Sequence, residues 1–349
     1  MTATDTPASG ALRRAGAALA GGGGGTVFAL LVLVFAVIFA INPAFARPPS
    51  LLAFAQQAAP LVVLAVGQYL VIVSGELDLS VGSLVGAQVV VAARLIDGQE
   101  PMTLPVLLVM LAFGAAVGLV NGLVTTVLKV PSIIATLGMM LVLYGAVRLW
   151  TGGAPTGALS EAFRVAGRGD AVVLPFIGGV PWAVLIAAAV GAAAVALMRS
   201  PYGRTLVAVG DNATAASFSG ARVWRVRTLA FVGSSVLATL AAVLIGGFAG
   251  VTAQVGEGLE FSAITAVVLG GVVLGGGRGA VPAAIGGALA VEALFTLFNQ
   301  LYLPSTIQPT VQGLIIIAAV AYAARRRSRR SPRAPASAGG PEKSPREEV

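Results

Sequence analysis

Residues 104–127, LPVLLVMLAFGAAVGLVNGLVTTV, form an unbroken stretch without a single charged side chain. A helix needs about 20 mainly apolar residues to cross the hydrocarbon core of a bilayer, so this stretch predicts a membrane span. Similar stretches recur along the 349-residue chain, of which 57% is hydrophobic and only 10% is charged. An average soluble domain is about 25% charged. The composition therefore excludes a soluble globular enzyme and predicts an all-α integral membrane protein.

The apolar stretches predict about ten transmembrane helices of roughly 20 residues each. The expected spans are 26–42, 53–74, 79–95, 104–127, 131–150, 180–198, 228–249, 262–275, 280–298 and 306–324. The eighth is short, so we expect a re-entrant or broken helix there. Together the spans form one membrane domain over 26–324. We expect disorder in the arm at 1–25 and in the basic tail at 325–349.

The net charge of +8 raises the alternative of a nucleic-acid-binding protein, but the placement of the charges argues against it. If ten spans alternate from an inner N-terminus, 17 of the 22 Lys and Arg residues fall on the inner side. Positive charge gathers on cytoplasmic loops, so the bias predicts that both termini are cytoplasmic. It also makes 199–227 a cytoplasmic loop, and the basic residues from Arg325 onward an anchor on anionic membrane lipid. We therefore expect no nucleic-acid partner.

The residues for catalysis and for nucleotide binding are missing. The chain has no Cys and no His, which removes thiol chemistry, the commonest general base and most metal sites. Neither of its only two lysines, Lys129 and Lys343, follows a glycine, as a P-loop requires. A transporter built from this chain, which would hold no cofactor, must take energy from another subunit or from an ion gradient. Glu292 is the only acidic residue deep in an expected span, so an ion-coupled carrier using Glu292 and Asp78 stays an alternative.

The most distinctive motif is 73-VSGELDLSVGS-83, where one apolar run stops and the next begins. Asp78 and Ser80 are typical helix N-caps, which satisfy backbone N–H groups that lipid cannot satisfy. Together with Gly75 and Gly82, they predict a capped, tight junction between two helices. The alternative interpretation is a gate or coupling element, because polar backbone at membrane depth must line protein or water.

Two further motifs follow. In the 199–227 loop, Asp211 or Asn212 can cap a short helix and Ser219-Gly220 can end it. A short helix outside the membrane suits docking into a groove of a partner. The second motif, 266-AVVLGGVVLGGGRG-279, lets helices break and backbones meet.

A weak internal echo links two of these regions. Leu77-Asp-Leu-Ser80 resembles Leu259-Glu-Phe-Ser262, and each stands just before an apolar run. In the ten-span topology the two lie on opposite sides of the membrane, with five spans between the equivalent helices. This spacing is typical of an inverted repeat of five plus five helices.

These motifs, in this order, resemble those of the permease subunits of ABC sugar importers of the ribose, xylose and autoinducer-2 type. The matching pieces beyond 74-SGELDLSVGS-83 are Asn121-Gly122, 129-KVPSIIATLGM-139, 201-PYGR-204 with Gly210, Asn212, Ala215-Ala216 and Ser219-Gly220, 266-AVVLGG-271, 275-GGGRG-279 and 312-QGLIII-317. The resemblance covers about residues 50–324. Glu76 departs from it, because many relatives have a small residue there.

The resemblance implies a homodimer in a bacterial cytoplasmic membrane. Its expected partners are a cytoplasmic ATPase subunit, which would hold ATP and Mg²⁺, and an extracytoplasmic solute-binding protein. The chain would then be a permease that translocates a monosaccharide-like solute, with nucleosides or branched-chain amino acids as alternatives. The resemblance also implies that the cytoplasmic loop couples to the ATPase through Tyr202, Gly203, Arg204, Gly210, Asn212, Ala215 and Gly220.

Candidates for the translocation path are few, because the spans contain few polar residues. Those at or near the expected spans are Gln57, Gln68, Asn121 and Asn299, with Gln56, Thr136 and Gln300 beside them. For each one, a hydrogen bond between helices is an alternative role.

Overall fold

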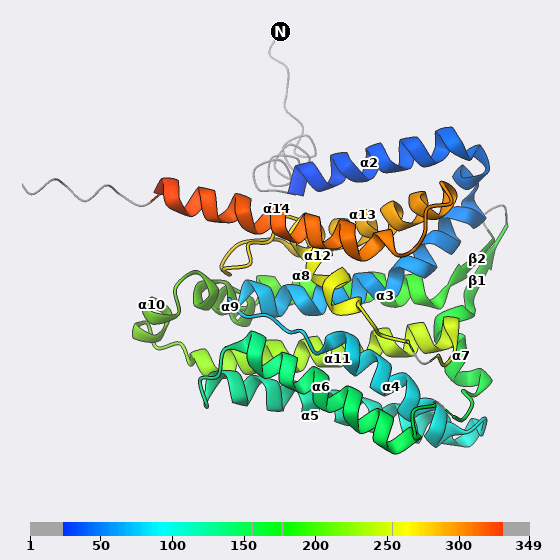
Figure 1. Ribbon diagram of the computed structural model, residues 1–349, viewed down its shortest axis with the longest axis horizontal. Coiled ribbons are helices and arrows are strands. Elements are labelled where there is room, and N and C mark those ends of the chain that lie inside the picture. Colours follow the sequence, from blue (N-terminus) through cyan, green and yellow to red (C-terminus); the bar gives the residue numbers. More distant parts are fainter. Residues whose placement is uncertain (1–23, 155, 176–177, 253, 331–349) are drawn as a thin grey trace, which may run out of the picture.

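The computed structural model describes residues 24–154, 156–175, 178–252 and 254–330, and it consists of long helices lying along a common axis (Figure 1). Nearly all of the expected arm at 1–25, and the tail beyond 330, lie outside these residues. The elements in chain order are α2 (Gly24–Ile41), the 3-10 helix η1 (Pro43–Ala46), α3 (Pro48–Val73), α4 (Val81–Ile96), the 3-10 helix η2 (Glu100–Met102), α5 (Thr103–Thr126), α6 (Ser132–Thr151), α7 (Glu161–Arg168), β1 (Asp170–Leu174), β2 (Gly178–Pro181), α8 (Trp182–Arg199), α9 (Pro201–Asp211), α10 (Ala213–Phe218), α11 (Val223–Ala249), α12 (Leu259–Leu269), α13 (Val281–Gln300) and α14 (Ile307–Arg330).

The bundle has two distinct ends. One end carries α9 and α10 and is called the α10 end below (Figure 1). The other carries α7 and the antiparallel hairpin of β1 and β2 and is called the hairpin end. In the part of the chain that the structure describes, six helices are long and apolar enough to cross a membrane, and four shorter apolar helices accompany them. The expectation of an all-α membrane protein is confirmed, apart from the small hairpin.

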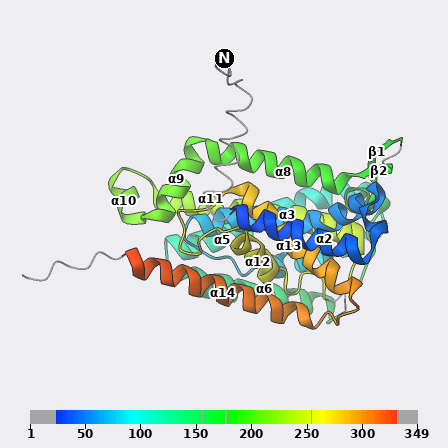
Figure 2. The ribbon, with the colours of Figure 1, turned by 90° about the horizontal axis from the view of Figure 1, so that it is seen from above.

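The centre of the bundle is formed by α3 and α11. In these helices 56% and 61% of the apolar span is buried, against 17% in α6. Figure 2 shows α8 and α14 on opposite sides of this centre. Small residues allow the helices to approach, since a Cβ at Gly122 of α5 would lie only 2.7 Å from the Cα of Thr228 on α11. The outer face of α6 is left for lipid or for another chain.

Two helices begin inside the bundle instead of at its ends. After α3 ends at Val73, the chain runs back into the bundle as an extended segment and forms α4 only from Val81 (Figure 1). On the other side, α12 has only 11 residues and follows the irregular segment after Gly250. The expected break near the eighth span is confirmed. The expectation of a tight helix junction around Gly75 and Gly82 is wrong. A longer extended segment separates α3 from α4, and side chains of α6 accept hydrogen bonds from its backbone.

The packing of these two helices agrees with an inverted repeat. The helix α4 contacts α5, α6 and α11, whereas α12 contacts α13, α14 and α3. The first five apolar helices (α2, α3, α4, α5 and α6) can be matched in order with the last five (α8, α11, α12, α13 and α14). Under this matching, the partners of α4 correspond one by one to the partners of α12. The four-residue echo between 77–80 and 259–262 therefore coincides with equivalent positions in the packing.

Structure that was not anticipated from the sequence occurs in three regions of the chain. The segment between α6 and α8 contains α7 and the hairpin, in which Val172 pairs with Val180. The 199–227 loop contains α9 as well as the expected short helix. The last helix, α14, continues through Arg325 to Arg330, where we had expected the tail to begin.

Candidate functional site

Three segments far apart in the sequence meet at the α10 end, in what we call the glycine junction (Gly75, Gly210, Gly276 and Gly277). The N–H of Gly277 donates a hydrogen bond of 2.9 Å to the carbonyl of Val73. A Cβ at Gly276 would lie 2.7 Å from the backbone N of Gly75 and 2.8 Å from the carbonyl oxygen of Gly210. All three glycine-containing motifs of the sequence thus pack backbone against backbone, which only residues without a side chain allow.

The expected coupling residues divide between two helices. Tyr202 and Gly203 lie on α9, where the Tyr202 hydroxyl donates a 3.1 Å hydrogen bond to the carbonyl of Val226. Gly203 is buried against the end of α8, and Arg204 next to it is exposed. Burial raises the pKa of Tyr202 above its usual value, so this hydroxyl stays a neutral donor. The helix α9 therefore contacts both α8, through Gly203, and α11, through Tyr202.

The exposed part of the loop is α10. Its N-cap is Asn212, one of the two caps that the sequence allows, and its side chain accepts a 2.9 Å hydrogen bond from the N–H of Ala215. The helix ends at Phe218, and Gly220 beyond it has a φ of +85°. The Phe218 side chain is 87% exposed, a feature that sequence reasoning missed. An exposed aromatic residue on a protruding helix is typical of a protein contact.

Replacing Asn212 with alanine should loosen α10 without disturbing the bundle. Losing an N-cap costs about 1 kcal/mol, which corresponds to about fivefold faster local opening. Hydrogen–deuterium exchange of residues 213–218 should therefore accelerate by about this factor. Asp211→Ala is the matched control, because Asn212 and not Asp211 supplies the cap. Equal exchange in the two variants would contradict the capping role.

The break between α3 and α4 is held by a buried polar network. One carboxylate oxygen of Asp78 accepts hydrogen bonds from the N–H of Ser80 at 2.9 Å and from its hydroxyl at 2.7 Å. Asn121 of α5 donates to the Ser80 hydroxyl at 2.8 Å. The expectation that the Ser80 side chain caps α4 is wrong, because Asp78 and Asn121 occupy its hydroxyl.

Side chains of α6 complete this network. The N–H groups of Leu77 and Leu79 donate to the hydroxyls of Ser132 at 3.2 Å and Thr136 at 3.0 Å. These bonds replace the intrahelical bonds that the extended backbone lacks, which a segment inside a membrane protein requires. The other carboxylate oxygen of Asp78 has no hydrogen-bond partner among the described residues.

The beginnings of α4 and α12 meet in the interior. Gly82 on the first turn of α4 leaves room for the Glu260 carboxylate, and a Cβ there would lie 2.6 Å from the carbonyl oxygen of Gly256. The four expected gate residues thus do different things. Gly75 belongs to the glycine junction, Asp78 and Ser80 hold the break, and Gly82 packs against the segment leading into α12.

A cavity of about 490 Å³ lies among α3, α11, α12, α13 and α14. Six amide side chains line it: Gln56, Gln57, Gln254, Asn299, Gln308 and Gln312. Glu257 and Glu292 also line it, and no Lys or Arg among the described residues does. Of the expected path residues, Gln57 and Asn299 face this cavity. The polar residues contributed by 254–262 and by α14 were missed, because no sequence pattern links these segments to α3.

The other two expected path residues lie elsewhere. Asn121 belongs to the Asp78 network. Gln68 is fully buried in α3, and neither polar atom of its amide has a hydrogen-bond partner among the described residues. It lies 11 residues beyond Gln57, about three helical turns, so both lie on the same face of α3. The polar face of α3 thus continues from the cavity into the closed part of the bundle.

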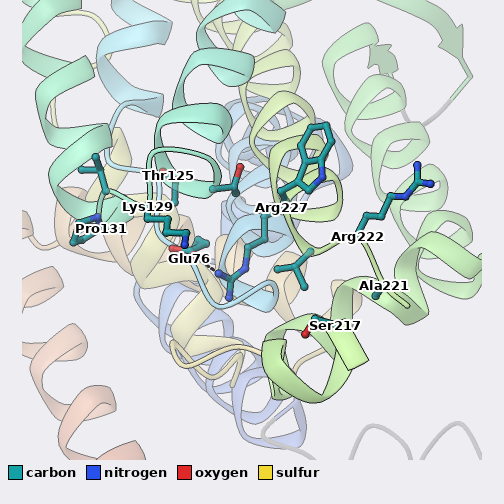
Figure 3. A pocket seen from close by; sticks show the side chains of 12 residues that line it. Glu76, Thr125, Lys129, Pro131, Ser217, Ala221, Arg222 and Arg227 are labelled. Atoms are coloured by element: carbon teal, nitrogen blue, oxygen red, sulfur yellow. Dashed lines mark ion pairs between the residues drawn. The ribbon is translucent and has the colours of Figure 1, made fainter. Parts of the chain in front are cut away.

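A second cavity, of about 560 Å³, lies at the α10 end between the α5–α6 loop and the start of α11. Figure 3 shows the ion pair between Glu76 and Arg227 at this cavity, and the end of the Arg222 side chain pointing away from that pair. The two charged groups are 2.6 Å apart. The sequence singled out Glu76 only as an acidic residue that departs from the family pattern, and it gave no reason to single out Arg227.

Comparison with known proteins now identifies the family. Residues 50–320 match the model of a family described as the permease component of branched-chain amino acid transport systems. The chain belongs to this permease family. The match covers α3 to α14, and so includes both cavities, the glycine junction and α10.

Individual members point to importers. The autoinducer 2 import system permease protein LsrC of Enterobacter sp. (strain 638) is 36% identical over 84% of each chain. The ribose import permease protein RbsC of Escherichia coli (strain K12) is 35% identical, over 84% of this chain and 91% of its own. The ribose permease of Haemophilus influenzae is 32% identical, over 84% and 90%. No solved structure matches the chain significantly.

Proposed function

We propose that the chain is the membrane-spanning subunit of an ATP-driven importer, with the α10 end in the cytoplasm. The observation that carries this proposal is its similarity to import permeases over 84% of its length. The exposed helix α10 docks on a separate ATPase subunit that binds ATP and Mg²⁺. A second copy of the chain completes the pore, and a binding protein delivers solute at the hairpin end.

The lining of the 490 Å³ cavity favours a neutral, polyhydroxylated solute such as a monosaccharide. Amide side chains donate and accept hydrogen bonds, which suits hydroxyl groups. A branched-chain amino acid carries an ammonium group, which Glu257 or Glu292 could pair with, and a carboxylate, for which the cavity offers no basic side chain among the described residues. An unpaired negative charge in such a site is costly, so the cavity disfavours amino acids.

Uptake by the complete system tests this proposal. The chain is co-expressed with the ATPase subunit and the binding protein encoded beside it, and uptake of labelled ribose, leucine and uridine is compared. We expect ATP-dependent uptake of ribose alone, and co-purification of the ATPase. Uptake that persists without the ATPase and collapses with an uncoupler would instead establish the ion-coupled carrier. Uptake of leucine would overturn the choice of solute.

Filling the cavity should block transport without breaking the complex. In Gln57→Trp a large ring enters the space that the solute needs, and we expect uptake to fall by about tenfold or more. Leu185→Trp on the exposed face of α8 is the control and should leave uptake unchanged. The measurement is initial uptake rate together with the amount of co-purified ATPase. Normal uptake in Gln57→Trp would mean that solute passes elsewhere.

A further inference from the structure

Arg227 lies on the first turns of α11, which follow α10 closely along the chain. Only four residues separate the end of α10 at Phe218 from the start of α11, and Arg227 follows one turn later. The hydrogen bond from Tyr202 to the carbonyl of Val226 fixes this turn to α9. A displacement of α10 by a docked partner therefore displaces the turn that carries Arg227.

The side chain of Arg227 contacts the break between α3 and α4 at two points. One guanidinium nitrogen lies 2.6 Å from a Glu76 carboxylate oxygen. The Nε–H donates a 3.2 Å hydrogen bond to the carbonyl of Ser74, which is the C-cap of α3. The two charged side chains are only 22% and 13% exposed, so water screens their attraction less than at an open surface.

The contacted segment leads directly to the interior. Two residues after Glu76 comes Asp78, whose hydrogen bonds to Ser80 set the start of α4. The start of α4 packs against the segment leading into α12 through Gly82 and Gly256. That same segment, together with α12, lines the 490 Å³ cavity, the one that holds the amide side chains. A displacement of Glu76 would therefore act close to the point where the start of α4 meets the segment before α12.

We propose that the Glu76–Arg227 ion pair transmits movement of α10 to the broken helices around the solute cavity. The inference rests on the proposed function, because α10 moves only if an ATPase acts on it. Of the two ion pairs among the described residues, this one joins the α11 turn next to α10 to the interior, whereas Arg168–Glu161 lies within the exposed α7 segment at the hairpin end. The 560 Å³ cavity beside the pair gives both side chains room to shift while they stay bonded.

Cysteine labelling tests this proposal without knowledge of the solute. The chain has no cysteine, so Leu61→Cys in the cavity wall provides a single reactive site. The full chain is placed in nanodiscs in complex with its co-purifying ATPase, and it is treated with a charged maleimide in two states. One state is free of nucleotide, and the other is trapped with ATP, Mg²⁺ and vanadate. With the ion pair intact we expect the two labelling rates to differ by about threefold or more. In Glu76→Gln and in Arg227→Gln this difference should vanish, with the ATPase still bound.

The reversed pair Glu76→Arg with Arg227→Glu should restore the difference, which a merely structural role of either residue would not predict. Arg225→Gln is the matched control, since Arg225 lies on the same turn but stacks on Trp224. Arg227→Lys keeps the charge and covers the case in which the glutamine variants fail to fold. A retained difference in both single variants, or no recovery in the reversed pair, would overturn the proposal. If the unaltered complex shows no difference or binds no ATPase, the proposed function itself fails.

Discussion

Replacing Gly210 with alanine is expected to abolish transport. A Cβ at this position would overlap the carbonyl oxygen of Val73 and would lie 2.6 Å from the backbone N of Gly277. Both atoms belong to backbone, and they are joined by the hydrogen bond from Gly277 to Val73. No rotamer change can relieve such a clash, so the three segments of the glycine junction must separate.

The expected size of the effect follows from the cost of separating packed backbone. Overpacking of this kind costs about 1–3 kcal/mol, and the displaced contacts are among those through which α9 touches the bundle. We expect uptake to fall by more than about tenfold, with a lower unfolding temperature of the detergent-solubilised protein. Both are measured on the purified complex.

Gly145→Ala is the control for this substitution. Gly145 lies within α6, and a Cβ there would meet nothing within 4 Å. Alanine favours helix by about 1 kcal/mol relative to glycine, so this variant should be at least as stable as the unaltered chain. Transport by Gly210→Ala equal to that of Gly145→Ala would show that the glycine junction has no role in the transport cycle.

The second large effect is expected from Asp78→Ala. The carboxylate is fully buried and accepts two hydrogen bonds from Ser80, at 2.9 and 2.7 Å. Its removal leaves the N–H and the hydroxyl of Ser80 without this acceptor inside the bundle. Each unsatisfied buried group costs about 1–3 kcal/mol, so the loss of an acceptor for two groups should lower the stability by about 2–6 kcal/mol in total. The start of α4 should lose its position, and uptake should be lost with it.

Two further variants separate the hydrogen bonds from the charge. Asp78→Asn keeps an acceptor oxygen and should retain most of the stability in thermal unfolding. Asp97→Asn, at the exposed C-terminal end of α4, should change neither the unfolding temperature nor uptake. If Asp78→Asn were as damaging as Asp78→Ala, the negative charge and not the hydrogen-bonded break would be the important property. That result would favour the ion-coupled carrier.

Local sequence patterns predicted the features that depend on neighbouring residues. Apolar stretches located the helices because the need to satisfy the backbone in lipid permits little else. A cap at Asp211 or Asn212 and a helix end just before Ser219-Gly220 could be recognised because both depend on residues within one or two turns. The same local patterns gave the wrong cap at Ser80, whose hydroxyl is occupied by a residue of another helix, Asn121.

The sequence by itself determined that this chain lies in a membrane, and where its helices and their glycine-containing interruptions fall. Tertiary structure alone decided that Gly75, Gly210 and Gly277 meet, and that Glu76 pairs with Arg227. It also decided which amides share a cavity. The physical reason is one of range. Hydropathy and capping are properties of a few adjacent residues, whereas packing, ion pairs and cavities join segments whose separation along the chain carries no signal.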